Sequence, residues 1–268
     1  MATIRIAFGI QKGGVGKTTS AICTGRALAD MGKKVLLVDL DPQSNLTMAC
    51  GIDPTELKYS TYDLLTNENV GVEQVIVRSP YGFDVLPAHI ALASAEVELV
   101  QVVNRERLLR EKYDGVEDEE GNLALKGVEE LGYDYVITDS PPSLGLLTLN
   151  VLTASDYVII PLQCQFFAVD GLKAFNDVID LVRRKLNRKL RLAGVLLTMH
   201  DARTNISKEI ESRVRQILGD VVFPTRIGDY SALVRVRNQG PIQAYEPRHQ
   251  AANQYNQFAR EVISRVQK

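Results

Sequence analysis

The feature that most constrains the fold is a glycine-rich loop, which lies between a strand-like run and a helix-like run near the N-terminal end of the chain. Residues 4–10 alternate large apolar side chains with smaller ones, which predicts a β-strand, and helical spacing runs from Lys17 to Met31. Glycine permits backbone dihedrals that turn successive N–H groups toward one point, and a helix N-terminus adds a positive field. A strand, a glycine loop and a helix in this order therefore predict a phosphate-binding loop.

The side chains of this loop suit a nucleoside triphosphate and its metal ion. Lys17 is expected to reach the β- and γ-phosphates, and the hydroxyl of Thr18 is expected to ligate Mg²⁺. The predicted ATP cradle consists of Lys12, Gly13, Gly14, Val15, Gly16, Lys17, Thr18 and Thr19. A purely structural turn would need neither the Lys-Thr pair nor this placement between a strand and a helix.

Strand-like and helix-like segments alternate along the rest of the chain. Gly32 can cap the first helix, and residues 34–39 form a short apolar run typical of a strand buried between helices. Further strands are expected at residues 83–86, 135–138, 157–161 and 193–199, and helices at 90–110, 169–186, 206–218 and 250–268. This alternation predicts an α/β fold with a doubly wound, mostly parallel sheet and helices on both faces. The length of 268 residues favours a single domain.

Composition argues against several classes of protein. The three cysteines, Cys23, Cys50 and Cys164, lie far apart without a Cys-x-x-Cys pair, so we expect reduced packing residues rather than a zinc site or redox pair. No apolar run approaches the length that spans a bilayer, and the N-terminus lacks the pattern of a signal peptide, which favours the cytoplasm. An acidic stretch near residues 112–128 is expected to be a solvated surface insertion.

Aspartates end two of the apolar runs that predict parallel strands. In an open α/β sheet, ligands bind at the carboxyl ends of such strands. Asp39 and Asp41 stand two residues apart, so both carboxylates lie on one face if the strand geometry persists. Asp139 ends the run at 135–138. Each aspartate could also be a simple helix cap, but together with the phosphate-binding loop they indicate a nucleotide and metal site.

Residues 11–19, Gln-Lys-Gly-Gly-Val-Gly-Lys-Thr-Thr, depart from the standard phosphate-loop motif through Gln11 and the additional Lys12. In both respects they resemble the deviant Walker-A motif of the ParA/MinD superfamily, in particular its ParA- and Soj-type P-loop ATPases. The resemblance implies a homodimer that encloses ATP, in which Lys12 contacts the phosphates of the partner's nucleotide as an arginine finger would. It also implies Mg²⁺-dependent ATP hydrolysis that is weak until a partner stimulates it.

The same resemblance assigns roles to the aspartates. Asp41 corresponds to the switch I residue that positions the attacking water, so the expected catalytic set is Lys12, Lys17 and Asp41. Asp139 looks like the Walker-B carboxylate that holds Mg²⁺ through water, and residues 140–145 resemble switch II. Asp39 has two open roles: it supports the Mg²⁺ waters beside Thr18 and Asp139, or it supports the loop itself.

The resemblance to Soj-like proteins extends through nearly the whole chain, for example over residues 35–43, 139–156 and 195–205. Two segments depart from it: the acidic insertion, and residues 225–231, where the family more often has Ile-Pro-Arg-Asn. For the adenine base, the resemblance suggests the loop after Leu197 and residues 241–248.

Charge is divided unevenly between the two parts of the chain. Residues 1–170 hold 13 Lys/Arg and 24 Asp/Glu, a balance of −11, whereas residues 171–268 hold 18 and 9, a balance of +9. The resemblance implies that the ATP dimer binds DNA without sequence preference through this basic part, which needs only cations that face phosphates. Arg203 is the first expected DNA-binding residue, followed by Arg235, Arg237 and Arg226. The basic run at 183–191 is either a further DNA contact or a helix end favoured by the dipole.

Taken together, the resemblance predicts a cytoplasmic, nucleoid-associated partition ATPase that segregates or positions a plasmid, a chromosome or another cargo. Its partner would be a ParB-like or other cargo adaptor that stimulates hydrolysis. A MinD-like membrane-associated positioning ATPase is the alternative, but the C-terminal helix carries few basic residues for an anionic membrane, so no membrane partner is expected. A relative of the nitrogenase reductase would need cluster-ligating cysteines, which the three cysteines do not supply.

Overall fold

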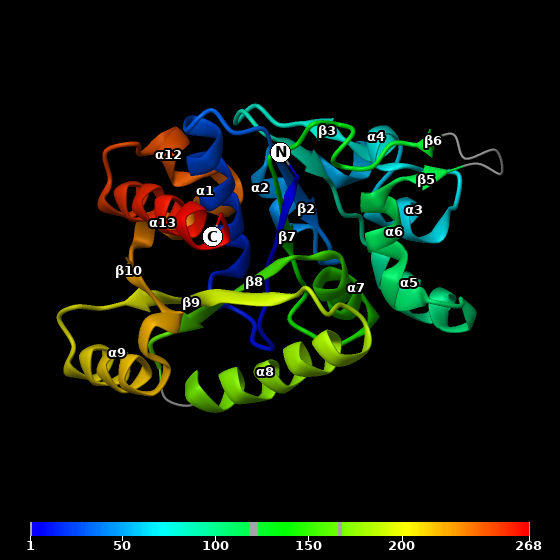
Figure 1. Cartoon of the computed structure of the whole chain (residues 1–268). Coiled ribbons are helices and arrows are strands. Elements are labelled where there is room, and N and C mark those ends of the chain that lie inside the picture. Colours follow the sequence, from blue (N-terminus) through cyan, green and yellow to red (C-terminus); the bar gives the residue numbers. More distant parts are fainter. Residues whose placement is uncertain (1, 118–122, 166–167, 268) are drawn as a thin grey trace.

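An eight-stranded sheet forms the centre of the computed structural model, which describes residues 2–117, 123–165 and 168–267 (Figure 1). The strand order is β10-β9-β8-β1-β7-β2-β4-β3. These strands are β1 (Ile4–Phe8), β2 (Val35–Asp39), β3 (Val77–Arg78), β4 (Asp84–Leu86), β7 (Tyr135–Asp139), β8 (Tyr157–Gln163), β9 (Arg191–His200) and β10 (Val222–Gly228). The pair β3–β4 is antiparallel and the other pairs are parallel, as expected for a sheet built from β-α-β units.

Helices connect the strands. The longer ones are α1 (Lys17–Asp30), α7 (Leu146–Ala154), α8 (Ala168–Lys185), α9 (Asn205–Leu218) and α13 (Gln250–Val266). The shorter ones are α2 (Asn45–Ala49), α3 (Thr61–Thr66), α4 (Val72–Val75), α5 (Leu92–Glu98), α6 (Leu108–Asp114), α10 (Ser231–Val234), α11 (Val236–Gln239) and α12 (Ile242–Tyr245). Among the described residues, no helix combines the length and the apolar character needed to cross a membrane.

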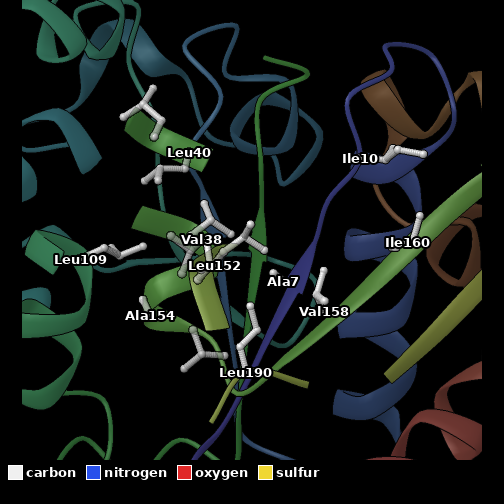
Figure 2. Packing of buried hydrophobic residues seen from close by; sticks show 14 of the residues in the cluster. Ala7, Ile10, Val38, Leu40, Leu109, Leu152, Ala154, Val158, Ile160 and Leu190 are labelled. Carbon is white, nitrogen blue, oxygen red and sulfur yellow. The ribbon is translucent and has the colours of Figure 1, made fainter. Parts of the chain in front are cut away.

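The central strands are buried because helices cover both faces of the sheet. Every residue of β2 and β7 is buried, which accounts for their continuous apolar sequences, since neither face of such a strand meets water. Ala7, Val38 and Val158 point to one face, where Figure 2 shows them with Leu152 and Ala154 of α7. Because these central strands pair in parallel, their carboxyl ends lie at one edge of the sheet.

The opposite face of the sheet carries the first and last long helices. Ile6, Phe8 and Leu37 point to that face and belong to a second apolar cluster with residues of α1 and α13. Figure 1 shows α1 and α13 side by side, with α8 across the sheet from them. The expected doubly wound α/β fold is therefore confirmed.

The prediction of a single helix at residues 90–110 is wrong. The chain forms α5, a short turn at Leu99–Gln101, a second at Arg105–Arg107 and then α6. Asn104 has a left-handed backbone (φ 59°), which a continuous right-handed helix does not accommodate. Strand β10 was not anticipated either.

The acidic stretch at 112–128 is more than a solvated loop in its described part. Lys112 and Tyr113 are buried in α6, and β5 (Val116–Glu117) pairs antiparallel with β6 (Leu123–Leu125). The most acidic positions, 118–122, lie outside the described residues.

Candidate functional site

The glycine loop between β1 and α1 is shaped to receive an anion. Gly14 and Gly16 have positive φ values of 72° and 83°, a region that other residues rarely adopt. A Cβ atom added at Gly13 or Gly14 would meet no atom within 4 Å, so open space lies beside the backbone there. Gly16 is the N-cap residue of α1 and has no side chain that could accept hydrogen bonds from the first N–H groups of the helix. These N–H groups are therefore available to a ligand.

Lys17 places an ammonium group inside this loop. Lys17 is 6% exposed, and its Nζ donates a hydrogen bond to the carbonyl of Lys12 at 2.9 Å. Burial lowers the pKa of Lys17, and the nearby carboxylates of Asp139 and Asp41 oppose that shift. A lysine ammonium has three donors, and this hydrogen bond uses one of them, so the group retains capacity for an anionic ligand.

Two aspartates face each other across adjacent strands. Asp39 of β2 and Asp139 of β7 are partners in the parallel register, and both are fully buried. Asp39 accepts hydrogen bonds from the backbone N–H and hydroxyl of Thr47 at 2.8 and 2.7 Å, and from the N–H of Asp41 at 3.1 Å. Burial raises the pKa of Asp39 to about 6, while these hydrogen bonds limit the rise. This geometry favours support of the loop over a metal contact for Asp39.

Asp139 has a different environment, with one oxygen available. Its Oδ2 accepts a hydrogen bond from the hydroxyl of Thr18 at 2.6 Å, but its buried Oδ1 has no hydrogen-bond partner among the described residues. Burial raises the pKa of Asp139 to about 8, and the charge of Asp39 adds to the rise. A buried oxygen without a partner destabilises the folded state unless a cation or a water molecule binds it. Mg²⁺ prefers oxygen ligands, so it is a suitable cation for this position.

The donor set around Asp139 fits Mg²⁺ of the kind that accompanies phosphates. No group of three His, Cys, Asp or Glu side chains in the described part of the chain could hold a metal by itself. Mg²⁺ usually keeps several waters and binds through one or two carboxylates plus substrate phosphates, so Asp139 and Thr18 suffice as the protein's share.

A cavity of about 410 Å³ opens beside these groups, and its lining includes Gly13, Lys17, Thr18 and Asp41. Asp41 is half-buried, and its Oδ1 accepts a hydrogen bond from the N–H of Gln43 at 3.0 Å. The structure thus brings the predicted loop residues and Asp41 to one space. The side chain of Lys12 is half-buried and forms no ion pair with another described residue.

A second cavity of about 210 Å³ adjoins the first, and its walls are largely apolar. Ile227, Tyr230 and Leu233 contribute apolar surface, and Gly16, Thr19, Met199 and Arg237 line both cavities. The adenine base was expected at a loop after Leu197 and at residues 241–248. Thr198 and Met199 line this cavity but still belong to β9, and residues 241–248 do not line it. The end of β10 and the segment that follows it contribute to the wall of this cavity. Met199 itself has a left-handed backbone (φ 50°), which is uncommon for a residue other than glycine.

The arginines predicted to bind DNA do not share one environment. The side chain of Arg203 is 89% exposed and donates to Asp201 through Nε at 2.9 Å and Nη2 at 3.1 Å. Arg226 pairs with Glu211 at 3.1 Å, and Arg235 pairs with Glu246. Arg237 lines the two cavities. Every arginine and lysine of the basic run at 183–191 is exposed, and Arg183 pairs with Asp180.

Comparisons with known proteins agree with this geometry. A family model described as an AAA domain matches residues 3–192. The sporulation initiation inhibitor protein Soj of Bacillus subtilis (strain 168) is 42% identical over 260 residues, which cover 97% of this chain and 98% of Soj. The chromosome partitioning protein ParA of Caulobacter vibrioides is 40% identical over 262 residues, which cover 97% of this chain and 94% of ParA.

A solved structure supports the same relationship. Cobyrinic acid a,c-diamide synthase from Mycobacterium smegmatis, with bound ADP and magnesium, has a TM-score of 0.80 and 35% identity over 97% of this chain and 93% of its own. The same protein has also been solved with a bound ATP analog and magnesium. Shared sequence over nearly the full length, together with the glycine loop and the doubly wound sheet, shows that this chain belongs to the Soj/ParA family of P-loop ATPases.

Proposed function

We propose that this protein is a partition ATPase that binds ATP and Mg²⁺, dimerises in the ATP state, binds DNA without sequence preference and so segregates or positions a cargo. The observation that carries the proposal is the buried, unpartnered oxygen of Asp139, which lies with the hydroxyl of Thr18 and the ammonium of Lys17 around the glycine cradle. A triphosphate with its metal ion would satisfy all three groups at once. The apolar second cavity would receive the base.

Each residue of the site has a role in this proposal. Lys17 and the loop N–H groups bind the phosphates, and Thr18 and Asp139 hold Mg²⁺, which neutralises charge on the phosphates when it is bound. Asp41 holds the attacking water, while Asp39 fixes the loop through Thr47. Lys12 contacts the nucleotide of the partner subunit, so only a ligand with a γ-phosphate favours the dimer.

The relatives support the direction of this proposal. The names of Soj and ParA refer to sporulation control and chromosome partitioning, and the Mycobacterium smegmatis protein was solved with ADP or an ATP analog and magnesium. Arg203 supports DNA contact because it is almost fully exposed on the loop that follows β9. We expect a ParB-like or other adaptor on the cargo to stimulate hydrolysis.

DNA binding as a function of nucleotide tests the proposal. The wild type with ATP and Mg²⁺ should bind a random duplex, and its affinity should fall steeply with salt, whereas the ADP form should bind weakly. Arg203→Glu should lose DNA and keep the ATP dimer, and Lys12→Ala should lose the dimer or turnover. Absence of DNA binding by an ATP dimer, combined with ATP-dependent binding to anionic liposomes, would favour the MinD-like alternative.

A further inference from the structure

The sequence places Arg237 among the expected DNA-binding residues, but the structure places it at the nucleotide cavities. It lies on α11 and lines both the phosphate cavity and the apolar cavity, together with Gly16, Thr19 and Met199. We propose that the guanidinium of Arg237 binds the phosphates of the nucleotide, and that it is not a DNA contact. This inference rests on the proposed binding of ATP.

The partners of the other arginines distinguish Arg237 from them. Arg203, Arg226 and Arg235 each donate to a carboxylate of this chain, respectively Asp201, Glu211 and Glu246. Within residues 2–117, 123–165 and 168–267, the side chain of Arg237 forms neither a hydrogen bond nor an ion pair. Arg237 is exposed at the cavity wall, so its five guanidinium donors can exchange water for phosphate oxygens and bind them through two parallel hydrogen bonds.

The charge of the site calls for such a cation. Asp39 and Asp139 are partners on adjacent strands, and Asp41 lines the phosphate cavity together with Lys17. Nucleotide phosphates bring several further negative charges into the same cavity. Arg237 adds a positive charge at the wall of that cavity, where it offsets this repulsion.

The backbone around Arg237 is well anchored, so the side chain starts from a defined place. Val236 is buried, α11 packs against α2, and the N–H of Gly240 bonds to the carbonyl of Val236 at 3.0 Å. Gly240 has a φ of 78°, and a Cβ there would overlap the ring of Tyr81. The α2 helix follows the Asp41 segment and contributes Asn45 and Ala49 to the same cavity. Arg237 is therefore carried by an element that borders the phosphate site.

The test compares Arg237→Gln and Arg237→Lys with Arg235→Gln, a matched control two residues away that lines neither cavity. Calorimetric titration of the full chain with ADP and Mg²⁺ gives the dissociation constant, since ADP avoids the coupling of ATP to dimerisation. Arg237→Gln should weaken ADP binding by about 10-fold or more, the effect of one lost charged hydrogen bond or two. Arg237→Lys should retain part of the affinity, and Arg235→Gln should stay within about twofold of wild type.

Three results would overturn the inference. Unchanged ADP affinity in Arg237→Gln would remove the residue from the site, and a loss in Arg235→Gln as large as that in Arg237→Gln would show that the effect is not specific to Arg237. A loss of DNA affinity by Arg237→Gln at saturating ATP, with its ADP affinity intact, would return Arg237 to the DNA surface. Wild-type protein that binds no nucleotide would refute the proposed function as well, which separates the two failures. Equal urea midpoints of the variants control for folding.

Discussion

Two lysines are buried in the part of the chain that the structure describes, one in the phosphate loop and one in α6, and their surroundings differ. Lys17 is 6% exposed and donates one hydrogen bond, to the carbonyl of Lys12. Lys112 is 8% exposed and donates three, to the carbonyls of Asn67, Glu68 and Val70 at 2.9, 2.9 and 2.7 Å. Burial lowers the pKa of both lysines.

Burial alone therefore does not identify a functional lysine in this molecule. The three donors of Lys112 are all used, and they tie α6 to the segment that follows α3, so its role is structural. Lys17 keeps donors free beside a cavity lined by Asp41 and the glycine loop, which fits the ligand-binding role proposed for it. The two lysines are similarly buried, and they differ in whether their ammonium groups keep unused hydrogen-bond donors beside a cavity.

The largest expected effect is that of Lys17→Met on ATP turnover. Methionine keeps the stem of the side chain but removes the charge that faces the phosphates, so turnover should fall by about 10²- to 10³-fold. Steady-state phosphate release with Mg²⁺ measures this effect, and urea unfolding should show little loss of stability. A variant that unfolds as readily as a core mutant would break the distinction between the two lysines.

The converse change, Lys112→Met, should act on stability. Three carbonyls lose their buried donor, and we expect the free energy of unfolding to fall by about 2–4 kcal/mol. Urea denaturation monitored by circular dichroism gives this value, while the ADP dissociation constant of the folded variant should match the wild type. Weakened ADP binding at a temperature where the variant is fully folded would contradict a purely structural role.

A smaller effect is expected from Asp139, the buried carboxyl group beside Thr18, on the pH dependence of stability. Burial raises the pKa of Asp139 to about 8 in the ligand-free protein, above its value in the unfolded chain. The folded state then holds this proton more tightly, so the associated stability is present near pH 4 and is lost as pH rises toward 8.

The variant Asp139→Asn cannot titrate at this position. From about pH 5.5 to about pH 8.5, the wild type without nucleotide should lose at least about 1 kcal/mol more unfolding free energy than Asp139→Asn, the equivalent of one pKa unit. Thermal or urea unfolding at each pH measures the difference. Parallel pH profiles for the two proteins would show that Asp139 ionises normally in the folded state.

Much of the fold was predictable because its signals are local. The continuous apolar runs that became β2 and β7 need no partner to be recognised as buried strands, and the glycine loop lies between adjacent elements. Strand β10 was not predicted because Pro224, a residue that argues against a strand, interrupts its apolar sequence. The expected helix at 90–110 failed because apolar spacing does not reveal a left-handed residue such as Asn104.

By itself the sequence determined the phosphate loop, the buried strands and the order in which acidic residues end them, since each depends on neighbours along the chain. Tertiary structure decided the rest. The register of β2 and β7 makes Asp39 a partner of Asp139, and the packing of α6 gives Lys112 its three carbonyls. The packing of α11 against α2 brings Arg237 to the cavities. These relations join segments far apart in the chain, so they depend on the geometry of packing, which no local pattern encodes.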